Sequence, residues 1–203
     1  TSRERYEYQT RFRVLPRCFG NYRLYGESIS VAEIHEVCVG NNTMPHEDYL
    51  ACRDFDLSLS ILNNGNMFDE VLGLAEVLEV PRSVLFRRIH EAAVAPGGTL
   101  EAVYRDFRAD EQRNFWKSLE ELEGFLSDAE GFDAYVSGGH GANQLLKYRA
   151  MALFEFLEDI TDVSIGAMRA ELRDWNLLDP VLNQYLDELR EVIIARKCQN
   201  TDV

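Results

Sequence analysis

The hydrophobic pattern of this 203-residue chain changes at residues 40–43. Before that point, residues 11–14 alternate arginine with apolar side chains, and residues 29–39 are rich in β-branched side chains. Both patterns favour β-strands. After Gly40-Asn41-Asn42-Thr43, which is typical of a turn, apolar residues recur at the three- and four-residue spacing of amphipathic helices. The sequence therefore predicts a mainly α fold, in which a multi-helix domain follows a short β-rich N-terminal arm.

Turn and capping residues predict where these elements begin and end. Phe19-Gly20-Asn21-Tyr22 is typical of a turn, because Gly and Asn tolerate left-handed backbone angles. We expect about six to eight helices after the arm. They cover about 43–62, about 67–78, a segment opened by Pro81, one long helix from Thr99 to about Leu126, a segment after Gly141, and a last helix capped by Asp179. The expected division is an arm over residues 1–43 and a helical domain over 44–203.

Charge is distributed unevenly along the chain. Its 21 Lys and Arg against 35 Asp and Glu give a formal net charge of −14. Residues 1–25 carry six arginines against two glutamates, so this stretch is +4 and the remainder is −18. So acidic a chain lacks the basic surface that general nucleic-acid binding needs, and it repels anionic lipid. Its apolar runs are also far shorter than the ~20 residues of a membrane span. We therefore expect neither a nucleic-acid partner nor a membrane partner.

The cysteines and histidines show no spacing typical of a disulfide framework or a metal site. Cys18, Cys38, Cys52 and Cys198 contain no C-x-x-C pair, which favours a reduced, cytoplasmic protein. The four histidines are dispersed and form no H-E-x-x-H motif, so we expect structural or surface roles for them. Acidic runs are expected to be solvated helix faces, and the aromatic residues are expected to be core.

A glycine-rich loop, Gly138-Gly139-His140-Gly141-Ala142-Asn143, precedes one predicted helix. Exposed amides at a helix start can hold an anion, although the Gly-Lys-Ser/Thr ending of a phosphate-binding P-loop is absent. The favoured interpretation is a connector in which glycine supplies positive φ angles and Asn143 helps to cap the helix.

Two segments, residues 10–20 (TRFRVLPRCFG) and 138–150 (GGHGANQLLKYRA), are also similar to a known family. Together with the strand at 29–39 and Asn41-Asn42-Thr43-Met44, they resemble the region after the catalytic barrel in cobalamin-binding radical S-adenosylmethionine proteins. Within this family, the resemblance is to the large group of proteins whose genes often lie near surface-carbohydrate genes. There, an LPRSFG-like stretch leads into a strand, an NTMS-like turn and a long helix. A G-x-x-G-x-N-x-x-x-K-Y-like segment follows much later.

The resemblance implies a C-terminal domain without its catalytic barrel and cobalamin-binding domain. Enzymes of this group hold a four-iron, four-sulfur cluster through C-x-x-x-C-x-x-C, and no such triplet occurs in this chain. We therefore expect no cofactor within the chain. The parent would use the cluster, S-adenosylmethionine and cobalamin as a methyltransferase or a related radical transferase. A chain that begins at Thr1 fits an excised piece, whose partners would be the missing domains of the same polypeptide and a small-molecule substrate.

The role implied for this domain is to position substrate and shield a radical intermediate, with the arm continuing from the barrel's last strand and the helices covering one barrel opening. The candidate substrate contacts are the residues beside the matched turns: Arg17, Asn41, Asn42, His140 and Asn143. An equally good interpretation gives Asn41 and Asn143 only turn and capping roles.

Two alternatives stay open beside this reading. The −18 balance of the helical part also fits a self-contained, acidic helical domain that binds a partner helix or a basic surface. A small hydrolase that uses dispersed carboxylates is the weakest alternative, since no spacing in the sequence selects it.

Overall fold

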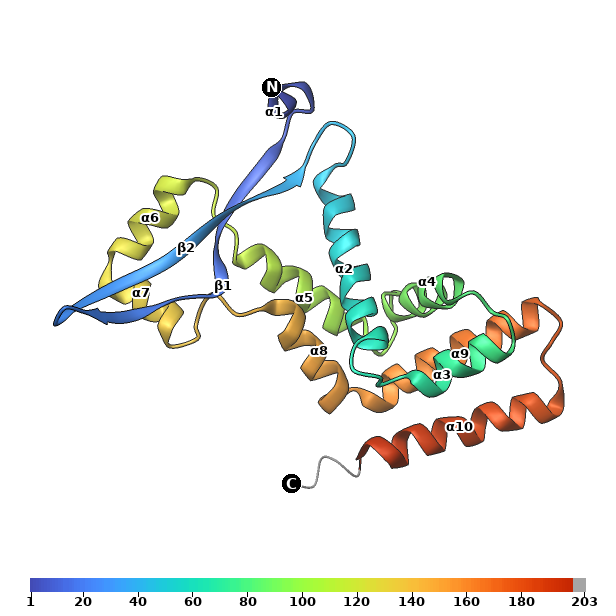
Figure 1. The fold of residues 1–203 in the computed structure, drawn as a ribbon. Coiled ribbons are helices and arrows are strands. Elements are labelled where there is room, and N and C mark those ends of the chain that lie inside the picture. The colour runs from blue at the N-terminus through green and yellow to red at the C-terminus, as the bar shows by residue number, and fades with distance from the viewer. Residues whose placement is uncertain (199–203) are drawn as a thin grey trace. The chain divides into compact units, whose positions relative to one another are not determined.

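The N-terminal arm is one long antiparallel hairpin. In the computed structural model, which describes residues 1–198, a short helix, α1 (Ser2–Arg5), precedes strands β1 (Gln9–Leu24) and β2 (Glu27–Gly40) (Figure 1). The strands are joined at Tyr25 and Gly26, whose φ angles of 51° and 90° are the positive values of a tight hairpin turn. The turn predicted at residues 19–22 is wrong, because these residues pair with β2 and the chain reverses only beyond them.

A bulge at residues 15–18, here called the β1 bulge, interrupts the pairing. Val14 and Phe19 are both paired with β2, but the four residues between them lie opposite a single residue of that strand. Pro16 has no N–H to donate to the ladder, and Arg17 has a φ of 67°, a left-handed value that is uncommon outside glycine. Such bulges bend a strand and redirect its side chains.

Nine longer helices follow within the described residues, more than the six to eight that the sequence predicts. They are α2 (His46–Asn63), α3 (Asp69–Val77), α4 (Arg82–Ala93), α5 (Glu101–Arg113), α6 (Leu119–Ser127), α7 (Ala129–Val136), α8 (Gln144–Glu155), α9 (Leu157–Asp174) and α10 (Pro180–Cys198). The mainly α class with a β-rich N-terminal arm is confirmed. Asp179 caps α10 as predicted, since its Oδ1 accepts from the Leu182 N–H at 2.7 Å. No helix among residues 1–198 combines the length and apolarity needed to cross a membrane.

The single long helix predicted from Thr99 to about Leu126 is wrong: it is two helices, α5 and α6. Between them, Trp116 bridges to Phe12 of β1, and the N–H of each residue donates to the carbonyl of the other at 2.7 and 2.9 Å. The backbone of Trp116 is therefore engaged outside any helix. The segment predicted as one helix after Gly141 likewise divides at Phe156 into α8 and α9.

Contacts between residues group the chain into two units. Unit 1 comprises Thr1–Arg53 and Phe107–Lys147, and unit 2 comprises Asp54–Asp106 with the residues from Tyr148 onward. The hairpin shares its unit with α6 and α7, so contacts do not mark a division at residue 43. The functional boundary predicted there stays a prediction.

The core of unit 1 lies between the hairpin and helices α6 and α7, which run beside it in Figure 1. Val14, Leu122 and Tyr135 are buried at its centre. Seven partly buried apolar side chains pack against them: Phe12, Phe19, Ala32, Ile34, Trp116, Phe125 and Leu126. The core therefore ties together strand and helix residues that are more than a hundred positions apart.

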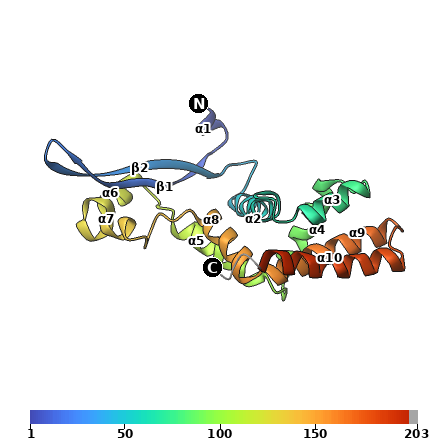
Figure 2. The ribbon, with the colours of Figure 1, turned by 60° about the horizontal axis from the view of Figure 1, so that its bottom comes forward.

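Helix α9 is central to unit 2, where it packs against α3, α4 and α10 (Figure 2). Met168 and Leu172 of α9, Leu85 of α4 and Leu186 of α10 are fully buried. These positions recur at helical spacing, so the predicted amphipathic stripes form the core of this unit.

Candidate functional site

A polar cavity of about 330 Å³ lies within unit 1. Its wall comes from β1, α2, α5, α7 and the segment that enters α8. The lining residues are Arg13, Val14, Leu15, Pro16, Arg53, Glu111, Asn114, Tyr135, Gly141, Ala142, Asn143, Gln144 and Leu145. We call this the Arg13 cavity. Its volume lies at the lower end of the range of small-molecule sites in proteins, about 300–1,000 Å³.

Arg13 stands two residues before the β1 bulge and supplies the unneutralised charge of this wall. Its guanidinium carbon lies 5.8 Å from the centre of the Phe115 ring, a cation–π arrangement that orients the side chain. Arg13 Nε is buried and has no hydrogen-bond partner. Among the described residues, no carboxylate forms an ion pair with it. A buried N–H donor without an acceptor is costly, and because Arg13 also lines the cavity, an anionic ligand there would meet a guanidinium that no carboxylate neutralises.

The second arginine of the wall is already paired. Arg53 Nε lies 2.9 Å from Glu111 Oε2, and Arg53 Nη2 lies 3.2 Å from Glu111 Oε1. The Glu111 side chain is only 5% exposed, which makes this a well-shielded, two-point pair. The pair contributes no net charge, and the cavity is therefore positive through Arg13.

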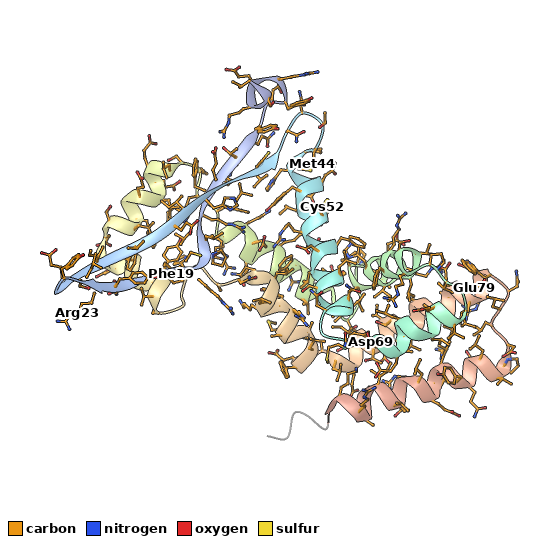
Figure 3. The ribbon with its side chains drawn as sticks, in the orientation of Figure 1. Phe19, Arg23, Met44, Cys52, Asp69 and Glu79 are labelled. Carbon is orange, nitrogen blue, oxygen red and sulfur yellow. The ribbon has the colours of Figure 1, made fainter. Side chains whose placement is uncertain are left out.

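The turn before α8 brings backbone close to two aromatic rings. Gly141 has a φ of 71°, and a Cβ there would lie 2.7 Å from Tyr135 Cδ1 and 2.9 Å from Phe19 Cε1. Only glycine fits both the backbone angle and the space. Phe19, labelled on β1 in Figure 3, also packs edge-on against Tyr135, with ring centres 5.5 Å apart. The glycine-rich loop is thereby held against the hairpin.

Asn143 and Gln144 have different roles at the start of α8. Asn143 Oδ1 accepts from the Leu146 N–H at 3.1 Å, so the predicted cap is present. Gln144 is only 8% exposed, and its Oε1 has no hydrogen-bond partner. The N–H groups of Gln144 and Leu145 belong to the first turn of α8, where a helix offers no internal acceptor.

Tyr135 adds a neutral phenol to the same wall. Burial raises the pKa of Tyr135, so the hydroxyl stays protonated at neutral pH. Trp116 Nε1 donates to that hydroxyl at 3.3 Å. The indole N–H of Trp116 is therefore a spectroscopic reporter close to the cavity.

A second, more open cavity of about 420 Å³ also lies in unit 1. It is lined by Arg17, Phe19, Gly138, His140, Gly141, Ala142, Asn143, Leu146 and Lys147. Three of these, Gly141, Ala142 and Asn143, also line the Arg13 cavity. Lys147 Nζ is held by Asp110 Oδ2 at 2.6 Å, whereas Arg17 has no ion pair among the described residues.

The structure brings together three of the five residues predicted as substrate contacts. Arg17, His140 and Asn143 line the second cavity. Asn41 and Asn42 line neither cavity. Asn41 Oδ1 accepts from the N–H groups of Thr43 and Met44 and from the Thr43 hydroxyl, and Asn42 Nδ2 donates to the Arg5 carbonyl at 3.2 Å. These contacts are those of turn residues, and the substrate role of all five stays a prediction.

Arg13 and Gln144 line the Arg13 cavity, but the sequence pattern does not predict them as site residues. Arg13 sits in an alternating stretch and looks like an exposed strand residue. The proline three positions later was an available signal of a bulge, because proline cannot pair in a regular ladder. Gln144 follows the predicted cap directly, but its burial depends on long-range packing that the local sequence does not contain.

The residues present do not fit an iron–sulfur cluster. The sequence has no C-x-x-x-C-x-x-C triplet, and no three His, Cys, Asp or Glu side chains within the described part of the chain are placed to hold a metal ion. We therefore derive no step of radical chemistry from this chain.

Unit 2 contains a different polar cluster. Ser58 Oγ lies 2.8 Å from His90 Nδ1 and 2.6 Å from the Tyr104 hydroxyl. Ser58 is 2% exposed, and the free space beside it is only about 10 Å³. A serine and a histidine in contact are typical of nucleophilic catalysis, but no substrate atom can reach this serine. The cluster satisfies buried polar groups inside the helical core.

Comparison of the chain with protein-family models, with curated proteins and with solved structures finds no match in any of the three.

Proposed function

We propose that this chain is the C-terminal domain of a cobalamin-dependent radical S-adenosylmethionine enzyme and that it positions and shields a small-molecule substrate. One observation carries the proposal. The two segments that resemble this family, residues 10–20 and 138–150, contribute to the same cavities in unit 1. Gly141 of the second segment lies so close to Phe19 of the first that no Cβ fits between them.

The proposal assigns substrate binding to this chain and radical chemistry to other domains of the parent enzyme. The Arg13 cavity has polar groups that can orient a ligand. In the parent enzyme, an iron–sulfur cluster with S-adenosylmethionine would generate the radical, and cobalamin would carry the transferred group. Those groups would be held by other domains of the polypeptide. Cys18, Cys38 and Cys52 are free thiols, which supports a cytoplasmic location.

The first test is to sequence the coding region upstream of the Thr1 codon. The proposal requires a C-x-x-x-C-x-x-C motif there, preceded by a cobalamin-binding domain. An upstream reading frame without that motif would contradict the proposal, whatever ligand the cavities of this chain bind.

The second test uses Arg17, whose positive φ allows an unusual substitution. Arg17→Gly removes the side chain and suits the left-handed backbone, so the thermal unfolding temperature of the full-length enzyme should stay equal or rise. We expect turnover to fall at least about tenfold, because a charged contact to substrate is lost. The matched control is Arg23→Gly, since Arg23 also lies on β1 but lines neither cavity. Equal turnover in both variants would contradict a substrate role for Arg17.

A feature of unit 2 favours the alternative of an interaction domain. A shallow groove of about 670 Å³ lies between α3 and α10, with Gly73, Leu74, Val77, Val181, Leu182 and Tyr185 as its apolar lining. Val77 and Val181 are 78% and 77% exposed, which is unusual for two neighbouring apolar side chains. Asp69 and Asp179 flank them, and unit 2 has ten Lys and Arg against twenty Asp and Glu.

The occupant that this groove and its charge fit is a basic amphipathic helix of a partner protein. A synthetic Leu/Lys amphipathic peptide should bind the chain, and its affinity should fall as salt rises. Val77→Asp should weaken that binding at least about tenfold, because a charge enters the apolar floor. Binding that is insensitive to both salt and Val77→Asp would rule this alternative out.

A further inference from the structure

The Arg13 cavity is built to take a ligand with two chemical features. The first feature is set by Arg13, whose Nε is buried without an acceptor and which has no acidic partner among the described residues. The Phe115 ring holds the guanidinium in place. Gln144 and Leu145, which line the same cavity, belong to the first turn of α8, where the N–H groups have no internal acceptor and the helix macrodipole is positive. All these groups favour an oxyanion.

The second feature is set by Gln144. Its side chain is more than nine-tenths buried, its Oε1 lacks a donor, and it lines the cavity. An oxyanion cannot satisfy this oxygen, because both groups are acceptors. The missing group is a donor such as a hydroxyl. Asn114, Asn143 and the neutral phenol of Tyr135 line the same space, so a polyhydroxylated ligand finds further partners there.

We propose that the Arg13 cavity binds a small organic oxyanion, a carboxylate or a phosphate, that also carries hydroxyl groups. Arg13 and the start of α8 hold the oxyanion, and a ligand hydroxyl donates to Gln144 Oε1. The cavity volume of about 330 Å³ accommodates a molecule of up to roughly fifteen non-hydrogen atoms. The claim that this ligand belongs to the enzyme's substrate class rests on the proposed function. The claim that the cavity binds such a ligand rests on these residues alone.

Four probes separate the two features. Glycerol phosphate and glycerate carry an oxyanion with hydroxyls, methyl phosphate carries the oxyanion alone, and glycerol carries the hydroxyls alone. Binding to the 203-residue chain is followed by NMR through the two indole N–H signals. Trp116 donates to Tyr135 at the cavity wall, and Trp175 in unit 2 serves as the internal control.

We expect glycerol phosphate or glycerate to shift the Trp116 signal saturably, with a Kd of about 1 mM or lower. Methyl phosphate should bind several-fold more weakly, and glycerol should cause no saturable shift. The preference between glycerol phosphate and glycerate then identifies the oxyanion as phosphate or carboxylate. Absence of saturable binding by both of these probes up to 10 mM, about tenfold above the expected Kd, would overturn the proposal.

Two variants test the assigned residues. Arg13→Met should raise the Kd of the better probe at least about tenfold, whereas Arg23→Met, the same charge change near the hairpin turn, should leave it unchanged (Figure 3). Gln144→Met should remove the several-fold preference over methyl phosphate without weakening methyl phosphate itself.

Arg13→Lys keeps the charge and guards against a folding defect in Arg13→Met. It should retain binding within about tenfold while the two indole signals keep their native positions. Equal affinity in the Arg13→Met and Arg23→Met variants would overturn the oxyanion assignment. A preserved preference in Gln144→Met would overturn the hydroxyl assignment. This test needs no radical chemistry. The binding proposal can therefore fail while the proposed enzyme family stands, and the proposed family can fail while the binding site stands.

Discussion

The Ser58 cluster of unit 2 and the wall of the Arg13 cavity in unit 1 use buried polar side chains in opposite ways. In unit 2, Ser58, His90 and Tyr104 bond to one another and leave about 10 Å³ of free space. In unit 1, Arg13 and Gln144 each have a buried polar atom without a partner, and both residues line a cavity of about 330 Å³. Buried polar groups that bond to each other stabilise a fold, whereas groups left facing space make a site. The same residue chemistry therefore serves structure in the Ser58 cluster and, in our proposal, ligand binding at the Arg13 cavity.

The largest expected effect is on the contact that forms the unit 1 site. Gly141→Ala places a Cβ at 2.7 Å from Tyr135 and 2.9 Å from Phe19 and also strains a positive φ. We expect a loss of about 3 kcal/mol in the free energy of unfolding, measured by urea denaturation with tryptophan fluorescence.

Gly138→Ala is the matched control for that change. Gly138 also has a positive φ, of 85°, but a Cβ there meets no atom within 4 Å. Its cost should be only the backbone strain, about 1 kcal/mol. Equal losses of unfolding free energy in the two variants would show that Gly141 is not packed tightly against Tyr135 and Phe19. The close contact that forms the unit 1 site would then be contradicted.

The next largest change in the free energy of unfolding is expected in unit 2. Tyr104→Phe removes one member of the bonded cluster and should cost about 1–2 kcal/mol in the free energy of unfolding, measured by urea denaturation. It should not alter the binding of glycerol phosphate. Burial also raises the pKa of Tyr104 to about 12, so the unfolded chain loses this proton first, near pH 10. Stability of the native chain should therefore fall between pH 10 and 12, and the Phe variant should lack this contribution.

Gln144→Met should change the free energy of unfolding in the opposite direction from Tyr104→Phe. It replaces a buried, unsatisfied amide oxygen by an apolar group of similar length. The free energy of unfolding, again from urea denaturation, should stay unchanged or rise by up to about 1 kcal/mol. A clear loss of stability would mean that Gln144 is a bonded structural residue, like the members of the unit 2 cluster.

The smallest effect concerns an arginine of unit 1 that does have an acidic partner. Arg3 donates to both oxygens of Glu36 at 2.6 and 2.8 Å, and these bonds lower the pKa of Glu36 to about 2. The pair should contribute to stability above the ordinary glutamate pKa near 4.5 and lose that contribution as the pH falls toward 2. An NMR titration of Glu36 in the Arg3→Met variant should show its pKa return toward 4.5. An unchanged pKa would contradict the two-point pairing.

Local signals predict where several helices begin, because caps and spacing are properties of neighbouring residues. Asp179 and Pro180 mark the start of α10 in the sequence as in the structure. The errors come from long-range pairing. The supposed turn at residues 19–22 is a strand because β2 pairs with it, and the helix predicted through Trp116 is broken where that residue meets Phe12.

The site was less predictable for the same reason. The glycine-rich loop was singled out by its composition, and its cap was predicted correctly. The loop becomes part of a cavity only because Gly141 meets Phe19, about 120 positions earlier in the chain. Without that contact, Arg13 looks like a strand arginine and Gln144 like an ordinary helix residue. The cavity therefore could not be predicted from spacing.

The β1 bulge has a consequence for how this chain can vary. In a regular hairpin, one inserted residue moves every later side chain to the opposite face. Here, residues 15–18 are looped out between two paired stretches, so an insertion or deletion among them is absorbed locally and both stretches keep their faces. The wall of the cavity can thus change length and chemistry while the hairpin core around Val14 and Phe19 keeps its packing. Related chains could accept different ligands by altering this one loop.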